Sequence, residues 1–340
     1  MDLYRNLLLI AIVAFANFLF YFYVMMFMAT EKAEMKKLLQ LQYRNLPPNK
    51  ELPTDDVLIP MEASKTTEQA FNVDPRSNYS FSLNNDQACK TNNTVFLLVV
   101  VFSTHEHFEN RRLIRKSWGS VNVVNDRNIV TIFLLGRVHD HDLQYEVEEE
   151  NKEYNDIIIG DFDDTYKNLT LKTIQTLKWS TQFCPDANYV MKTDDDMFVH
   201  YLNIVQFLAG KTKKKNFAVG CYMKTKPIRN VRSKWYMPKQ IFSKNIYPPF
   251  LSGTGYIMSR DLVSRMYKVS SEISYLHLED VFAGTIWEKL GVKPEGNSKF
   301  HNYQVKYSHC AYQKLFTSHT SPNFVHIWTE MKVKRKESCK

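Results

Sequence analysis

The sequence lacks several short motifs that identify common metal and nucleotide sites. It has no Cys-x-x-Cys pair of a zinc site, no His-Glu-x-x-His motif of a metalloprotease and no Walker-type phosphate loop. It also has no internal repeat of fixed period and no nucleic-acid recognition motif, so we expect neither a repeat architecture nor a nucleic-acid partner. A hydrophobic content of 44% over 340 residues nevertheless favours a folded globular chain over a disordered one.

Negative charge is in the minority, since 36 acidic residues against 44 Lys and Arg give a net charge of +8. Part of the excess comes from two basic clusters, at residues 211–215 and 332–336. The simplest interpretation is a solvated loop and a solvated tail. Attraction for an anionic substrate or for membrane headgroups is the alternative that the sequence leaves open.

One long apolar run, residues 7–29, is interrupted only by Asn17 and could span a bilayer of roughly 30 Å as a helix. We interpret it as a transmembrane signal anchor that follows a short tail, residues 1–6. A cleaved signal peptide is the alternative, but the run exceeds the usual apolar region and residues 27–29 offer no small-x-small cleavage site. The charges on the two sides of the run do not decide its orientation.

Three glycosylation sequons and all five cysteines follow this run. The sequons begin at Asn78, Asn92 and Asn168 and are useful only in a secretory lumen, where disulfides also persist. Four cysteines can pair in three ways and leave one thiol. The cysteines are Cys89, Cys184, Cys221, Cys310 and Cys339.

Two regions of different composition follow the apolar run. Residues 30–88 are punctuated by prolines without sustained apolar periodicity, which predicts a stem, and we place the catalytic domain at residues 89–340. From about Thr94, short apolar runs alternate with helix-compatible stretches, which is typical of a mostly parallel sheet with helices. Strands are predicted at 95–102, 129–135, 156–159 and 189–192, and helices at 111–118, 142–154 and 166–183, the last capped by Asp164 or Thr165.

Three consecutive aspartates, Asp194, Asp195 and Asp196, follow the last of these strands. Adjacent carboxylates repel one another, so packing explains them poorly, whereas Mg²⁺ and Mn²⁺ prefer such oxygen ligands and bridge them to a diphosphate. Sheets of this kind bind ligands at the carboxyl ends of their strands. We therefore predict a divalent-metal site here, with a solvated acidic loop as the alternative.

Two further segments could carry chemistry. Glu279 and Asp280 either begin a helix and complement its dipole, or one of them acts as a general base toward a hydroxyl group. The stretch 252–256 (SGTGY) either lets the backbone approach a ligand or bends into a strand, and it lacks the third glycine of a dinucleotide fingerprint. An isolated histidine such as His319 is ordinarily a surface or packing residue.

Six segments in fixed order resemble the β-1,3-glycosyltransferases, a family that includes the β-1,3-galactosyltransferases and their N-acetylglucosaminyl relatives. The likeness extends from about Cys89 to Trp328, and the anchor and stem are similar to those of type II Golgi enzymes. The segments are 111–119 (RRLIRKSWG), 161–173 (DFDDTYKNLTLKT), 192–199 (KTDDDMFV), 234–238 (KWYMP), 247–256 (YPPFLSGTGY) and 277–281 (HLEDV).

The resemblance implies a GT-A fold, an α/β domain with a Rossmann-like mixed sheet flanked by helices. It also implies a UDP-sugar donor, a glycan acceptor and Mn²⁺ or Mg²⁺, in a Golgi membrane enzyme whose catalytic domain is luminal. Asp196 and His319 would bind the metal, Asp194 and Asp195 would contact the ribose side of UDP or support the metal shell, and Asp280 would be the base. Further contacts to the nucleotide sugar, or else structural ion pairs, are expected of Arg111, Arg115 and Lys172.

The segments KWYMP and YPPF resemble the galactosyl branch most, so the expected reaction is inverting transfer of galactose from UDP-galactose to a 3-hydroxyl group. Three other functions are open. They are transfer from a UDP-sugar that carries N-acetylglucosamine or N-acetylgalactosamine, glycan binding by an inactive scaffold, and metal-dependent hydrolysis. Acceptor identity and oligomeric state are open at this point. Galactosyl members often carry cysteines near Leu251 and Thr285 that are absent here, which implies Cys89 with Cys184, Cys310 with Cys339, and a free Cys221.

Overall fold

The structure, a computed structural model, describes residues 79–90, 93–212, 215–320 and 324–334, together with Glu337 and Cys339. The expected tail at 1–6, the anchor at 7–29 and most of the expected stem lie outside these ranges. Among the helices that are described, none combines the length and the apolar character that crossing a membrane requires.

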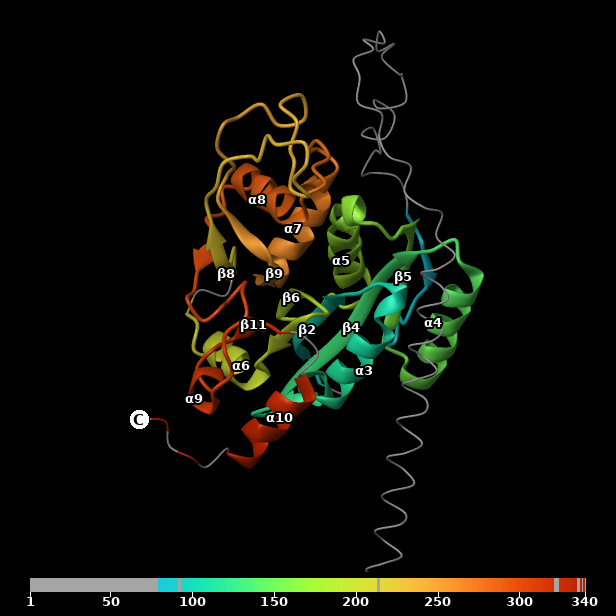
Figure 1. The fold of residues 1–340 in the computed structure, drawn as a ribbon, viewed down its shortest axis with the longest axis vertical. Coiled ribbons are helices and arrows are strands. Elements are labelled where there is room, and N and C mark those ends of the chain that lie inside the picture. Colours follow the sequence, from blue (N-terminus) through green and yellow to red (C-terminus); the bar gives the residue numbers. More distant parts are fainter. Residues whose placement is uncertain are drawn as a thin grey trace, which may run out of the picture. The chain divides into compact units, whose positions relative to one another are not determined.

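A mixed sheet organises this part of the chain, with strand order β1-β5-β4-β2-β6-β9-β8-β10 and β3 added beside β4 (Figure 1). The neighbours β5, β4, β2 and β6 are parallel, whereas β9 runs antiparallel to both β6 and β8. A separate ribbon pairs β7 with β11. The strands are β1 Phe81–Leu83, β2 Val95–Phe102, β3 Val123–Val124, β4 Arg127–Arg137, β5 Ile157–Asp163, β6 Tyr189–Asp194, β7 Met197–Val199, β8 Ala218–Met223, β9 Phe250–Ser259, β10 Glu295–Gly296 and β11 Thr317–His319.

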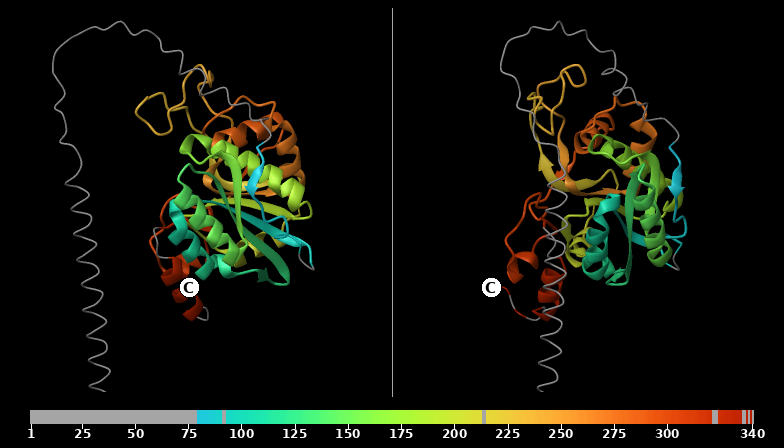
Figure 2. Two further views of the ribbon diagram at one scale, coloured as in Figure 1. Left: turned by 90° about the vertical axis from the view of Figure 1, so that its right-hand side faces the viewer. Right: turned by 45° about the vertical axis from the view of Figure 1, so that its right-hand side comes forward.

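Helices cover both faces of the sheet, which is why its central strands are apolar on both sides (Figures 1 and 2). In β2, Leu98 and Val100 pack with the helices α5, α7 and α8, while Leu97 and Val99 pack with α3, α4, α6 and α10. Successive side chains of β2 point to opposite faces of the sheet, so this strand contributes to two hydrophobic cores. The helices are α3 Phe108–Lys116, α4 His141–Tyr154, α5 Leu169–Phe183, α6 Tyr201–Ala209, α7 Arg260–Ser270, α8 Glu279–Lys289, α9 His309–Tyr312 and α10 Phe324–Val333.

The predicted strands and helices are confirmed, with two corrections. The predicted cap of the helix at 166–183 is wrong: a 3-10 turn, Tyr166–Asn168, precedes α5, and neither Thr165 nor Asn168 makes a side-chain capping bond. The expected domain start at Cys89 is late, because β1 already pairs with β5. Three residues with little periodicity gave no strand signal there.

The disulfides implied by the resemblance are confirmed. Cys89 bonds Cys184 and Cys310 bonds Cys339, with sequence separations of 95 and 29 residues, while Cys221 is free. The first bridge joins the segment between β1 and β2 to the C-terminal end of α5.

Loss of the longer bridge is expected to cost more stability. Chain-entropy arguments give about 4–5 kcal/mol for Cys89→Ser with Cys184→Ser, and about 3–4 kcal/mol for the equivalent change at Cys310 and Cys339. Urea unfolding of the full-length chain in detergent, followed by tryptophan fluorescence, measures both losses. A larger loss at the shorter bridge would contradict the expectation.

Candidate active site

The three aspartates lie where β6 ends and the chain turns into β7. Asp194 is paired with Phe102 at the end of β2, and the backbone N–H of Asp195 donates to the carbonyl oxygen of Phe102 at 3.1 Å. On the other side of β6, Thr193 is paired with Gly255 of β9. The aspartates therefore occupy the carboxyl end of a central strand, next to the SGTGY segment.

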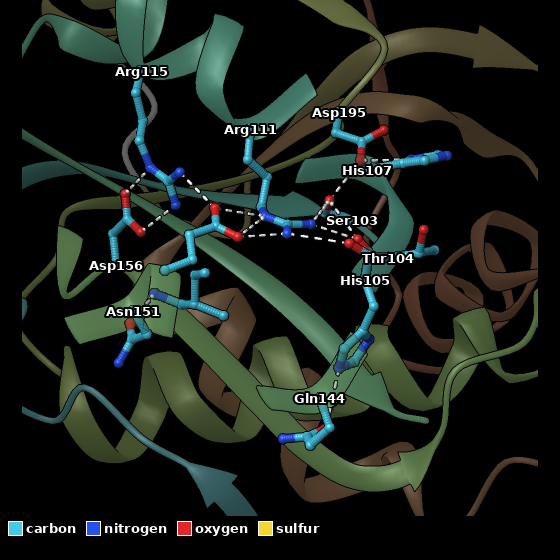
Figure 3. Close-up of polar contacts among 12 residues, drawn as sticks. Ser103, Thr104, His105, His107, Arg111, Arg115, Gln144, Asn151, Asp156 and Asp195 are labelled. Atoms are coloured by element: carbon cyan, nitrogen blue, oxygen red, sulfur yellow. Dashed lines mark hydrogen bonds and ion pairs between the residues drawn. The ribbon is translucent and has the colours of Figure 1, made fainter. Parts of the chain in front are cut away.

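Asp195 points into the protein. Its carboxylate accepts a hydrogen bond from Ser103 Oγ at 2.6 Å and contacts His107 Nδ1 at 2.9 Å (Figure 3). It also accepts a hydrogen bond from Asn110 Nδ2 at 3.4 Å. The residue is 4% exposed, and its bond to His107 is the main cause of the raised pKa of that imidazole. Asp195 thus supports the turn, and the half-exposed His107 is the member of this group that a ligand could reach.

Asp196 points outward and meets His319. The β7–β11 pairing sets His319 opposite Met197, and the backbone N–H of Thr320 donates to the Asp196 carbonyl oxygen at 2.9 Å. His319 Nε2 lies 3.1 Å from Asp196 Oδ2, with the two side chains 43% and 45% exposed, and Asp196 Oδ1 has no hydrogen-bond partner among the described residues. A carboxylate oxygen and an imidazole nitrogen that face the same space suit Mn²⁺.

No cluster of three or more Asp, Glu, His or Cys side chains suited to a metal ion occurs within the described ranges.

Lys192 connects the aspartates to the second acidic segment. Its ammonium lies 2.7 Å from Asp194 Oδ1 and 3.1 Å from Glu279 Oε1, and it also donates to the carbonyl oxygen of Gly253. Burial lowers the pKa of Lys192, but the carboxylates of Asp194 and Glu279 outweigh it and hold the pKa above its ordinary value. Three elements, β6, β9 and α8, are joined at this one buried cation.

Glu279 and Asp280 begin α8, as the helix-start interpretation predicted, but their environments differ. Glu279 is 4% exposed and accepts hydrogen bonds from Thr173 Oγ1 at 2.9 Å and Tyr256 Oη at 3.0 Å, so it is fully engaged. Asp280 is less buried, and one of its oxygens accepts from the Val281 N–H at 2.8 Å. Burial, and then the charge of Glu279, raise the pKa of Asp280 to about 7, which suits a general base near neutral pH.

The structure places Arg111 and Arg115 in ion pairs, which is one of the two roles expected for them (Figure 3). Arg111 is 0% exposed; its guanidinium lies 2.6 Å from a Glu150 oxygen and also donates to Ser103 Oγ at 3.1 Å. Arg115 bonds Glu150 at 2.6 Å and Asp156 at 2.8 Å. These pairs hold α3 against α4 and fix the Ser103 segment that supports Asp195.

Lys172 is likewise in an ion pair, which is the second of the two roles that the resemblance left open for it. It is 1% exposed, lies 2.8 Å from Asp164 and donates to the carbonyl oxygen of Ser103 at 2.5 Å. Sequence reasoning missed Lys192 and His107 as site residues. A lysine inside an apolar strand was the available signal for Lys192, because a buried cation requires buried anions.

A cavity lies elsewhere in the domain. About 610 Å³ of space lies among residues that precede β2 and β6, including Lys90, Asn93 and Asp186. These residues stand at the amino ends of the strands, whereas the aspartates stand at the carboxyl end of β6. We therefore exclude this cavity from the candidate site.

The chain is similar in sequence to known galactosyltransferases over most of its length. Residues 109–298 match the family described as galactosyltransferase. The chain is 42% identical over 271 residues to β-1,3-galactosyltransferase 1 of Homo sapiens and of Mus musculus, covering 78% of this chain and 82% of the relative. It is 36% identical over 276 residues to human β-1,3-galactosyltransferase 2, covering 77% of this chain and 64% of the relative.

Among solved structures, the galactosyltransferase LgtC in complex with donor and acceptor sugar analogues is similar with a TM-score of 0.39 and 13% identity. That match covers 70% of this chain and 95% of the other. The fold assignment here rests on the strand order and on the sequence relatives, not on this likeness.

Proposed function

Because the chain belongs to the β-1,3-galactosyltransferase family, we propose that it transfers galactose from UDP-galactose to the 3-hydroxyl of an acceptor sugar, with inversion. The acceptor would be carried on a glycolipid or a glycoprotein. The observation that carries the proposal is the junction at Lys192, which connects Asp194, beside the metal-binding candidates, to Glu279, the neighbour of the base candidate Asp280.

In this mechanism Asp280 acts on the acceptor. Its carboxylate accepts the proton of the 3-hydroxyl while that oxygen forms a bond to C1 of the donor galactose. The bond from C1 to the diphosphate oxygen breaks with its electron pair, and UDP leaves from the opposite face. A single displacement inverts the α linkage of the donor to a β product and needs no carboxylate nucleophile.

Asp196 and His319 would hold Mn²⁺ or Mg²⁺, and such an ion would neutralise charge that develops on the departing diphosphate. Asp194 would face the nucleotide, with Lys192 holding its carboxylate in place. Asp195 would act indirectly, since it is bonded to Ser103 and His107.

We also propose a GT-A fold and a luminal Golgi location behind an N-terminal membrane anchor. The mixed sheet with aspartates at the end of β6 supports the fold. The two disulfides and the sequon positions support an oxidising luminal compartment.

Metal removal tests the donor half of the proposal. EDTA is expected to abolish transfer from UDP-galactose by the full-length chain in detergent, and Mn²⁺ is expected to restore it. Asp196→Asn should raise the Mn²⁺ concentration for half-maximal activity roughly 10–100-fold or more, as loss of groups at metal sites does. Asp186→Asn, a matched change at an exposed carboxylate before β6, should leave it unchanged.

A panel of UDP-sugars and of acceptors ending in galactose, N-acetylglucosamine or N-acetylgalactosamine tests the assignment itself. Transfer from another donor would keep the mechanism and overturn the galactosyl assignment. Release of free sugar at equal rates with and without acceptor would indicate a hydrolase. A fragment that starts at Cys89 is unsuitable for these assays, because it would lose β1.

A further inference from the structure

The segment between β2 and α3, residues 103–107, lies where the order of the parallel strands reverses. From β2 the chain continues through α3 to β4 and through α4 to β5, on one side of β2, whereas α5 leads it to β6 on the other side. The helices α3 and α5 pack in different cores, on opposite faces of the sheet. Open sheets bind ligands outside the carboxyl ends of their strands at such a point. The segment therefore stands where a nucleotide would bind.

Buried cations hold this segment in place. The Arg111 guanidinium donates to Ser103 Oγ at 3.1 Å, and the Lys172 ammonium donates to the Ser103 carbonyl oxygen at 2.5 Å. The His107 N–H closes the turn by donating to the Thr104 carbonyl oxygen at 3.2 Å. The backbone that carries His107 is thus preorganised, so a ligand that binds this histidine would not have to order it.

The His107 side chain has one engaged and one available nitrogen. Nδ1 lies 2.9 Å from Asp195 Oδ2 (Figure 3). An ionised carboxylate only accepts hydrogen bonds, so Asp195 fixes a proton on Nδ1 and orients the ring. Nε2, on the opposite edge of the ring, has no hydrogen-bond partner in the part of the chain that the structure describes, and 50% of the side chain is exposed. Asp195 thus leaves Nε2 for a ligand.

His107 also gives this edge of the sheet a cationic group that a ligand can reach. A diphosphate is bound best by donors that carry positive charge. Arg111, Lys172 and Lys192 do not meet this need, since each is at most 2% exposed and lies 2.6–2.8 Å from a carboxylate. The hydrogen bond to Asp195 raises the pKa of His107, and a neighbouring diphosphate would raise it further. Both nitrogens of the charged ring are donors.

We propose that the Nε2–H group of His107 binds the diphosphate of the UDP donor, and that Asp195 is the residue that positions this imidazole. The same positive charge would stabilise the negative charge that develops on UDP as it leaves. Asp195, 6% exposed at its side chain, would then act on the donor through His107 and not by direct contact. The inference rests on the proposed transferase function, and it adds a residue that binds the donor.

Binding of UDP to the full-length chain in detergent, measured by calorimetry with Mn²⁺ present, tests the contact. His107→Gln is expected to raise the Kd of UDP roughly tenfold or more, the usual effect of losing a hydrogen bond between charged groups. Binding of uridine, measured by saturation-transfer NMR, should not change. The matched control is His139→Gln, which removes an 86%-exposed imidazole that lies 3.6 Å from Asp163 and should leave the Kd of UDP unchanged.

Proton uptake provides a readout that a purely structural role would not move. Because a bound diphosphate favours the charged imidazole, the wild type should take up more protons on binding UDP near neutral pH than His107→Gln does. Calorimetry in buffers of different ionisation enthalpy measures the difference.

A double variant tests the role of Asp195. Asp195→Asn should weaken UDP binding, and adding it to His107→Gln should weaken binding little further, because the two residues act as one unit. Losses that add in the double variant would show a separate contact of Asp195 and would overturn its positioning role.

The outcomes separate this inference from the proposed function. If the wild type binds UDP and His107→Gln binds it more weakly, the contact stands even where galactose proves to be the wrong sugar. An unchanged Kd and unchanged proton uptake in His107→Gln would overturn the contact, while galactose transfer by the wild type would continue to support the enzyme. An equal weakening of uridine binding would also overturn it, because His107 would then not act on the diphosphate.

Discussion

Replacement of Asp280 by asparagine is expected to lower kcat by roughly 10²–10⁴-fold, the usual contribution of a general base. The amide keeps the shape of the side chain and can still accept the hydrogen bond from the Val281 N–H, so α8 should begin as before. It cannot accept a proton from the acceptor hydroxyl. Initial rates with saturating UDP-galactose and acceptor measure the loss, and circular dichroism checks the fold.

The pH profile provides a second readout of the same residue. Because the pKa of Asp280 is about 7 and the base acts when deprotonated, kcat/KM for the wild type should fall as pH falls through about 7. The matched control is Asp142→Asn, which changes an exposed carboxylate that also lies in the first turn of a helix. This variant should keep the kcat/KM of the wild type. An Asp280→Asn enzyme with at least a tenth of wild-type activity would exclude Asp280 as the base.

Replacement of Lys192 by methionine is expected to lower the free energy of unfolding by about 3–5 kcal/mol, because it leaves the buried Glu279 carboxylate without its cation. Lys192 is 2% exposed and Glu279 is 4% exposed, so water cannot replace the lost interactions. Urea unfolding of the full-length chain in detergent measures the change. Lys116→Met, at an exposed position on α3, should alter stability by less than about 0.5 kcal/mol.

A double variant distinguishes charge from packing. If unpaired charge causes the loss, adding Glu279→Gln to Lys192→Met should recover part of the stability. The deficit of Lys192→Met should also shrink as pH falls toward 4. Protonation of the carboxylates would remove the unpaired charge, so the stability penalty is present where they are ionised and is lost where they are protonated. If neither Glu279→Gln nor a lower pH reduces the loss of stability in Lys192→Met, the cause is lost packing and not unpaired charge.

The parallel half of the sheet could be predicted from sequence because its strands are continuous apolar runs separated by helix-length segments. Residues 95–102 show this most clearly, since every second side chain enters a different core. The antiparallel half carries weaker signals. β8 contains Gly220 and Cys221 and lies before a long loop, and β1 has only three residues. Pairing with distant strands, not local periodicity, defines these elements.

The site was predictable to the level of its segments but not of its side-chain directions. The strand-end rule located Asp194, Asp195 and Asp196, yet the turn after β6 sends Asp195 inward and Asp196 outward. No local pattern distinguishes the two. Similarly, the partner of Lys192 is Glu279, 87 residues away along the chain, so its role becomes visible only when β6 and α8 are placed together.

Gly253, at the start of β9, places a limit on how this enzyme can evolve. A Cβ atom at this position would overlap the Glu279 carboxylate and lie 3.6 Å from Lys192 Nζ, where the backbone carbonyl of Gly253 accepts a bond from that ammonium. Even alanine would push apart the groups that join β6 to α8. A lineage that drifts away from glycine here could retain every acidic residue of the site and still become a catalytically silent paralogue.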